Sequence, residues 1–152
     1  MDSDCLIKLV KSSLKEPVCA NFSVMIPQLV YKEIIEDGKE HPDAVVVRNN
    51  LERKLLTRSK QEVQVGKGEE AVYAVFQKGN YDAICSDDKR FTKRLRLFDI
   101  PYLTPAVLIA LLLKKQKITV EEALNKLESL SPMISDEEYS TVKVVLETWR
   151  IE

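Results

Sequence analysis

Histidine, cysteine and long apolar runs are scarce in this sequence of 152 residues, and each scarcity excludes a class of protein. The one histidine, His41, lies in a polar stretch where we expect a loop, so catalysis through a histidine base is not indicated. Three widely spaced cysteines without a Cys-x-x-Cys pair argue against a disulfide framework and a zinc site. The longest apolar run, residues 106–113, is too short to cross a bilayer, and residues 1–4 show no signal-peptide pattern. We therefore expect a cytoplasmic protein with no membrane partner.

The composition is that of a globular protein with one core. Hydrophobic residues make up 45% of the chain and charged residues 31%, and the chain is long enough to bury a core without a structural metal. Lysine plus arginine (23) nearly balances aspartate plus glutamate (24), for a formal net charge of -1. An interaction with nucleic acid must therefore depend on where the charges lie rather than on their sum.

Short apolar runs alternate with amphipathic stretches, which predicts an α/β fold with a short parallel sheet. The helices expected from apolar spacing and capping residues span 4–14, 17–22, 28–37, 42–55, 69–78 and 88–98, and another begins at 105. Strands are expected at 23–26, 63–65 and 83–86, with an extended piece at 100–103. Two capping-box pairs, Thr119 with Glu122 and Ser135 with Glu138, predict a C-terminal helical hairpin over 120–130 and 136–149.

Acidic residues gather where the predicted strands pass into helices. They are Asp2 and Asp4, Glu33, Glu69 and Glu70, and Asp87 and Asp88. In a parallel sheet these transitions share one edge, so the carboxylates are expected to converge and to raise one another's pKa. A hard divalent cation, Mg²⁺ or Mn²⁺, would relieve that repulsion. The alternative is that each acid only caps a helix or complements its dipole, as Asp88 would do for the helix after it.

Four motifs in order along the chain carry a resemblance to a known family. They are Asp2-Ser3-Asp4-Cys5-Leu6-Ile7-Lys8-Leu9, then Ile26-Pro27 with Val30-Tyr31-Lys32-Glu33-Ile34-Ile35, then Gly68-Glu69, and then Ser86-Asp87-Asp88-Lys89-Arg90-Phe91. Together they resemble the PIN-domain ribonucleases, in particular a VapC-like branch with a glycine-glutamate pair and a double aspartate. The resemblance implies a three-layer α/β/α fold over residues 1–115, with residues 116–152 as a helical extension packed on it.

The same resemblance implies an activity and a set of site residues. The activity is that of an endoribonuclease that needs Mg²⁺ or Mn²⁺ and hydrolyses RNA phosphodiester bonds. Its metal ligands and catalytic acids would be Asp2, Glu33, Glu69 and one of Asp87 and Asp88. Glu70 and Asp4 are second choices at their sites, and Ser86 matches a small hydroxyl residue that precedes the last acid.

The start of the sequence departs from the family pattern. The family has an apolar strand before its first aspartate, and that strand lies in the middle of the sheet, whereas Asp2 here follows Met1 directly. Either the natural start lies upstream, or the sheet is left with two strand edges that face a gap.

Basic residues follow the double aspartate and suggest where RNA would bind. With Ser86, the candidate RNA contacts are Lys89, Arg90, Lys93 and Arg94. The alternative is a solvated basic helix face. Residues 121–152 are rich in acids and predict a poor RNA surface, and their apolar positions would pack on the rest of the chain, on a second copy or on an antitoxin. The size of the chain is similar to that of the toxins of toxin–antitoxin pairs.

Two other functions are compatible with the same residues. A degenerate PIN module would act as a binding or assembly partner without cutting RNA, and the missing first strand favours that hypothesis. A phosphatase resembling the haloacid dehalogenases would use Asp2 and Asp4 as its Asp-x-Asp motif and Asp87-Asp88 as its late acids, although Cys5 does not fit that motif.

Overall fold

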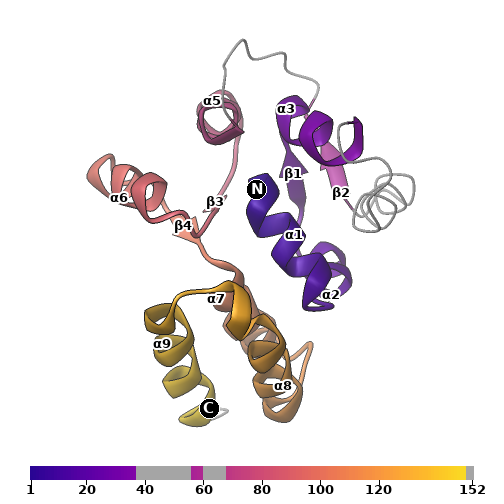
Figure 1. Cartoon of the computed structure of the whole chain (residues 1–152), viewed down its shortest axis with the longest axis vertical. Helices are drawn as coiled ribbons and strands as arrows, with labels where there is room; N and C mark the ends of the chain where they lie inside the picture. The colour runs from indigo at the N-terminus through magenta and orange to yellow at the C-terminus, as the bar shows by residue number, and fades with distance from the viewer. Residues whose placement is uncertain (37–55, 60–67, 150–152) are drawn as a thin grey trace.

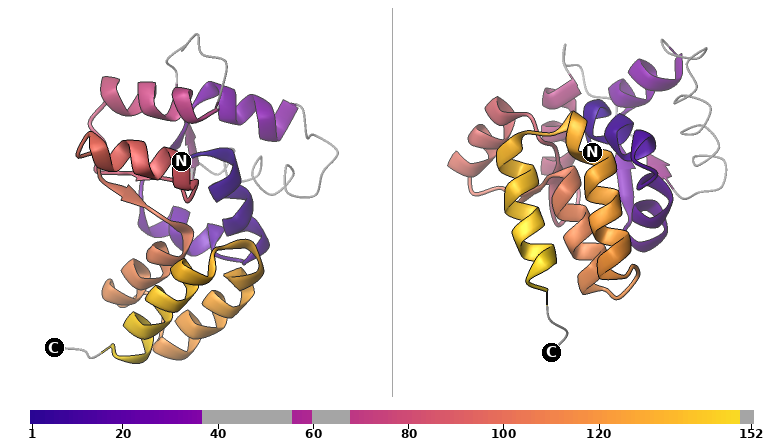
Figure 2. Two further views of the ribbon diagram at one scale, coloured as in Figure 1. Left: turned by 60° about the vertical axis from the view of Figure 1, so that its left-hand side comes forward. Right: turned by 60° about the horizontal axis from the view of Figure 1, so that its bottom comes forward.

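The computed structural model describes residues 1–36, 56–59 and 68–149 (Figure 1). The helix predicted over 42–55, the strand predicted at 63–65 and His41 lie outside these residues. Figure 2 shows the strands with their helices in one half of the molecule and a bundle of C-terminal helices in the other, and the N-terminus lies in the half that holds the strands. Within the described residues, no helix is long and apolar enough to span a membrane.

The strands among the described residues form two small parallel sheets. Strand β1 (Val24–Ile26) pairs with β2 (Leu56–Arg58), with Met25 opposite Thr57, and β3 (Ile84–Cys85) pairs with β4 (Tyr102–Leu103), with Ile84 opposite Tyr102. The parallel pairing confirms the predicted α/β fold. Strand β2 was not expected from the sequence, because three residues that follow a predicted helix show no period of their own.

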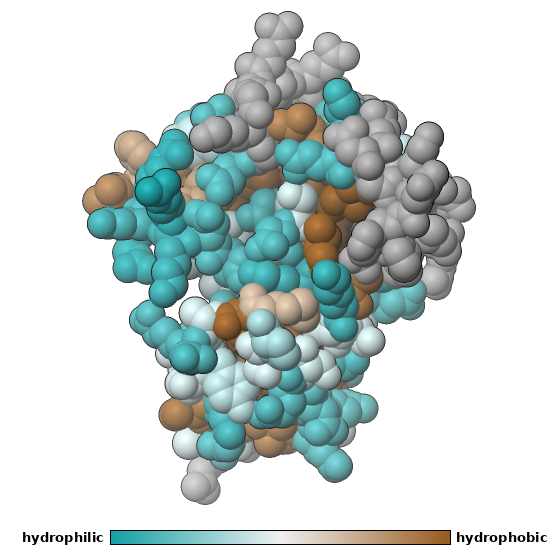
Figure 3. Space-filling view, in the orientation of Figure 1, coloured by the Kyte–Doolittle hydropathy of each residue, from teal (hydrophilic) through white to brown (hydrophobic). Residues whose placement is uncertain are grey.

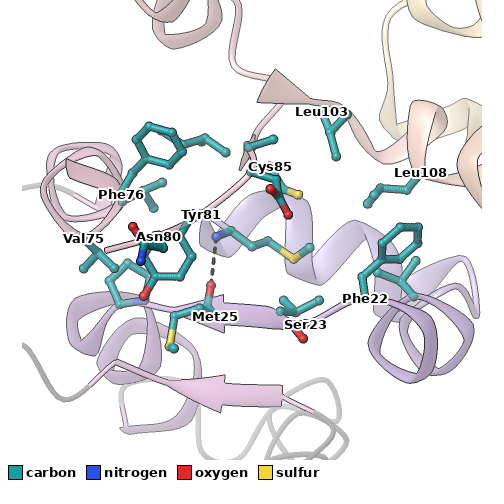
Figure 4. A pocket seen from close by; sticks show the side chains of 18 of the residues that line it. Phe22, Ser23, Met25, Val75, Phe76, Asn80, Tyr81, Cys85, Leu103 and Leu108 are labelled. Carbon is teal, nitrogen blue, oxygen red and sulfur yellow. Dashed lines mark hydrogen bonds between the residues drawn. The ribbon is translucent and has the colours of Figure 1, made fainter. Parts of the chain in front are cut away.

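Within the described residues no strand joins the two sheets, and a gap separates β1 from β3. Residues 1 and 2 bridge it, because the Met1 ammonium donates to the Met25 carbonyl at 3.0 Å and the Asp2 N–H donates to the Cys85 carbonyl at 3.2 Å. Beside this bridge lies a pocket of about 450 Å³ between β1 and β3 (Figure 4). Its lining is largely apolar and includes Phe22, Val75, Phe76, Leu103 and Leu108.

Helices α1 (Ser3–Lys11) and α2 (Lys15–Asn21) follow the bridge. Helix α1 buries Cys5, Leu6 and Leu9 and ends three residues earlier than the spacing predicts. The reason is local: the Ser12 hydroxyl donates to the Lys8 carbonyl at 2.8 Å, and Ser13 has a positive φ of 58° that does not continue a helix.

The remaining helices have these bounds. After β1 come α3 (Gln28–Tyr31) and a π-helical turn, η1 (Lys32–Glu36); α5 (Gly68–Lys78) precedes β3, and α6 (Lys89–Leu97) follows it. After β4 come α7 (Pro105–Lys114), α8 (Val120–Leu130), the 3₁₀ turn η2 (Ser131–Met133) and α9 (Asp136–Glu147).

Helix α7 is the centre of the C-terminal bundle, and it packs against α8, α9, α1 and α2. Its buried residues include Ala106, Leu108, Ile109 and Leu112. The predicted capping box of α8 is confirmed, because Thr119 and Glu122 bond to each other's backbone N–H groups. At α9 only half of the box forms: Ser135 accepts from the Glu138 N–H, but the Glu138 carboxylate accepts from the Ala106 N–H of α7 at 3.1 Å.

Candidate active site

Asp2 lies in the gap between the two sheets, which we call the seam, and is the N-cap residue of α1. Its Oδ1 accepts a hydrogen bond from the Cys5 N–H at 2.9 Å, so the carboxylate caps the helix. Only 7% of the residue is exposed, and this burial raises the pKa of the Asp2 carboxyl. Hydrogen bonds from Ser86 and Cys5 oppose the rise in pKa, and the negative charge of Asp87 adds to it.

Asp87 and Asp88 follow β3 and take different partners. The Asp87 side chain is 8% exposed, and its Oδ2 lies 2.6 Å from the Lys8 ammonium of α1. Asp88 begins α6 and accepts from the Phe91 N–H at 2.8 Å. The predicted capping role of Asp88 is therefore real, and it leaves the second carboxylate oxygen of Asp88 for other partners.

Glu69, in the first turn of α5, faces both Asp88 and Asp2. Burial raises the pKa of the Glu69 carboxyl, and the charges of Asp88 and Asp2 raise it further, whereas Arg94 lowers it. Glu69 and Asp88 also share a hydrogen bond. Carboxylates from two other elements therefore repel the Glu69 carboxylate at this edge of the sheets.

Glu33 and the two second-choice acids lie at the margin. Glu33 is exposed on η1 and accepts a hydrogen bond from the Ser3 hydroxyl at 2.9 Å, beside Asp2 in the chain. Glu70 is exposed on α5. The Asp4 side chain is 70% exposed and lies 2.9 Å from the Lys8 ammonium, so it extends the ion pair of Asp87 rather than the group around Asp2.

Two site residues were missed by sequence reasoning. Burial lowers the pKa of Lys8, but its hydrogen bonds to Asp87 and Asp4 outweigh burial and raise this pKa to about 12. Burial raises the pKa of Glu138, Asp87 raises it further, and Lys8 lowers it, so α9 brings another carboxyl close to this ion pair. The spacing of Asp4 and Lys8 on one helix face was the available signal for Lys8; nothing local marks Glu138.

The predicted RNA contacts divide into two groups. Lys89, Arg90, Lys93 and Arg94 are all exposed on α6. Ser86, which we grouped with them, is instead fully buried, and its hydroxyl bonds to Asp2 and accepts from the Asp88 N–H at 3.3 Å. A buried Ser86 holds the acids in place and has no surface to offer to RNA.

The donor set at this edge has the chemistry of a Mg²⁺ or Mn²⁺ site. Asp2, Glu69 and Asp88 supply hard oxygen ligands, and their mutual repulsion is what a divalent cation would offset. As they stand, no three histidine, cysteine or acidic residues in the described ranges are close enough together to hold an ion. The carboxylates would therefore have to rotate toward one another to bind it.

The parallel strands and the helices around them define an α/β protein that carries acidic residues at one edge of its sheets. A family model described as a PIN domain, DUF3368, matches residues 1–148, which is nearly the whole chain. The chain belongs to this PIN-domain family, whose members are generally nucleases, and the predicted family is thereby confirmed. No curated protein and no solved structure matches the chain.

Proposed function

We propose that the protein is an endoribonuclease that requires Mg²⁺ or Mn²⁺, with Asp2, Glu69 and Asp88 as the metal ligands. The observation that carries the proposal is the position of Glu69, whose pKa is raised by burial and by the charges of Asp88 and Asp2. Carboxyls whose pKa is raised by burial and by neighbouring charges are concentrated at functional sites. Asp87 and Glu33 flank this group as further candidate ligands.

The chain's own residues would orient the ligands and the substrate. The Cys5 and Phe91 N–H groups fix one oxygen each of Asp2 and Asp88, and Lys8 fixes Asp87. The exposed cations of α6 would bind the phosphates on either side of the cleaved bond. When bound, the metal would make a water a better nucleophile at neutral pH and stabilise charge on the phosphate.

A role as the toxin of a toxin–antitoxin pair extends this proposal. It is supported by the exposed Val144 and Val145 of α9, which an antitoxin or a second copy could cover. The VapC-like branch and a cytoplasmic location belong to the same proposal. Membership of the PIN family removes the phosphatase hypothesis.

The second candidate is a PIN module that binds without cutting. It is favoured by the split sheet and by the lack of a ready-made metal cage among the described residues. The two candidates differ in one measurable property, which is metal-dependent cleavage of RNA.

The test is cleavage of a mixed RNA pool in Mn²⁺, Mg²⁺ or EDTA by the wild-type chain and by Asp88→Asn. Asparagine still caps α6, so the variant should fold. We expect cleavage only with metal, and a loss of about 100-fold or more in the variant. The matched control is Asp99→Asn, an exposed acid just past α6 with a positive φ of 55° that asparagine tolerates, and it should cleave normally. Absence of cleavage by the wild type, with retained RNA binding, would favour the binding module.

A further inference from the structure

Two large apolar side chains lie exposed at the C-terminal end of α6. Leu97 is 74% exposed and Phe98 is 65% exposed, whereas Phe91 and Leu95 on the other side of the same helix are buried. Figure 3 shows apolar atoms among hydrophilic ones at the edge of the molecule where Figure 1 places α6. The fold leaves most of Phe98 uncovered, and adjoining exposed apolar side chains can mark a binding site.

Phe98 lies in line with the cations of α6. The Phe98 N–H donates to the Arg94 carbonyl at 3.3 Å, and the helical repeat places Arg90, Arg94 and Phe98 along one stripe. Asp88 lies at the other end of that helix, about 15 Å away at 1.5 Å per residue. The stripe therefore runs from the acids toward Phe98. Arg94 lies on the stripe and is near enough to the acids for its charge to lower the pKa of Glu69.

The side chains around Phe98 suit a ligand that carries several negative charges and flat rings. Residues 89–98 contain five cations (Lys89, Arg90, Lys93, Arg94 and Arg96) and no acid. Arg96 is engaged with Tyr102, whose hydroxyl it contacts at 2.7 Å and whose ring it covers. In the described part of the chain, Phe98 takes part in no ring stacking or cation–π contact. Cationic side chains followed by an exposed aromatic ring suit single-stranded nucleic acid, because the cations bind its phosphates and the ring stacks on a base.

We propose that Phe98 is a stacking platform for one base of a single-stranded RNA that lies along α6, a few nucleotides from the phosphate at the acids. This inference rests on the nuclease function proposed above and adds a specificity-determining residue to it. An RNA held in a duplex cannot offer that base, so the platform selects unpaired substrates.

The test measures binding, in EDTA, of the full chain to a fluorescent single-stranded RNA of about 12 nucleotides over a range of salt concentrations. Phe98→Ala should weaken binding by at least about fivefold at every salt concentration, without a change in the slope of log K against log salt. Phe98→Trp should restore the affinity. The matched control is Leu97→Ala, an equally exposed but non-aromatic neighbour, which should stay within about twofold of the wild type.

The outcomes separate this inference from the function on which it rests. Wild-type binding with an unchanged Phe98→Ala affinity overturns the stacking platform alone, and so does an equal loss in Leu97→Ala. Size-exclusion chromatography of the same variants identifies a protein interface instead, if Phe98→Ala shifts an oligomer to a monomer. A wild-type chain that neither binds nor cleaves RNA overturns the proposed nuclease as well.

Discussion

At the scale of single residues, the ion pair of Lys8 and Asp87 joins α1 to the end of β3. Their charged atoms lie 2.6 Å apart, and the two side chains are only 15% and 8% exposed. Removing one partner leaves a nearly buried charge without its counterion, which costs more than the loss of a surface pair.

We therefore predict that Lys8→Met lowers the free energy of unfolding by about 1–3 kcal/mol, as measured by urea denaturation. Lys8→Arg should retain most of the stability, and Lys11→Met, an exposed lysine on the same helix, should have little effect. The raised Lys8 pKa makes this contribution complete below the ordinary value of 10.5, and it is lost as pH rises through about 12. A Lys8→Met chain as stable as the wild type at neutral pH would contradict the role of the pair.

Asp2 is predicted to have the opposite effect on stability. Burial raises the pKa of its carboxyl, so the folded chain holds the charged form at a cost above that pKa. Asp2→Asn removes the charge and keeps a residue that caps α1, and should raise the free energy of unfolding by about 0.5–2 kcal/mol at neutral pH. The gain should shrink as pH falls toward the ordinary value of 3.8, where the wild-type carboxyl becomes neutral too. Denaturation at both ends of that range checks the sign, and a gain that grows in acid would refute it.

At the scale of elements, the gap between β1 and β3 is the main irregularity. In the part of the chain that the structure describes, each strand pairs on one side only, and residues 1 and 2 supply hydrogen bonds across the gap. The pocket beside them has a largely apolar lining. A strand added there would remove apolar side chains from water.

Extending the chain before Met1 by a short run of valine and isoleucine should fill this gap. We predict a rise of at least about 2 kcal/mol in the free energy of unfolding, because the added strand buries apolar area and pairs with both edges. A glycine-serine extension of the same length is the control and should have no effect. Equal denaturation curves for the two extended chains would show that the pocket does not accept a strand.

Sequence reasoning succeeded where the signal was local and failed where it was not. Asp88, Thr119 and Ser135 cap helices because a capping side chain bonds within three residues of itself, which the sequence displays directly. Strand β2 depends on pairing with β1, some thirty residues earlier, and its own three residues carry no alternation. Lys8 and Asp87 are 79 residues apart in the sequence, so their ion pair could not be predicted from it. The pairing of Lys8 with Asp4, one helical turn away, could.

At the scale of the whole molecule, the acids come from both sides of the seam between the sheets. Glu33 follows β1 on one side, Glu69 and Asp88 lie around β3 on the other, and Asp2 is the bridge. The candidate ligands for a metal are therefore predictable as residue types at sheet edges. The distances between these residues are not predictable, because they depend on how residues 1 and 2 hold the two sheets relative to each other.

Glu138 gives the C-terminal bundle a part in this arrangement. Its carboxylate is hydrogen-bonded to the first turn of α7, and its pKa responds to Asp87 and Lys8, although α9 begins only at Asp136. A change that moves α9 would therefore also change the charges around the Lys8–Asp87 ion pair. Glu138 thus links α9 to the ion pair that joins α1 to the end of β3, so the first and the last helix of the described chain share one group of charges.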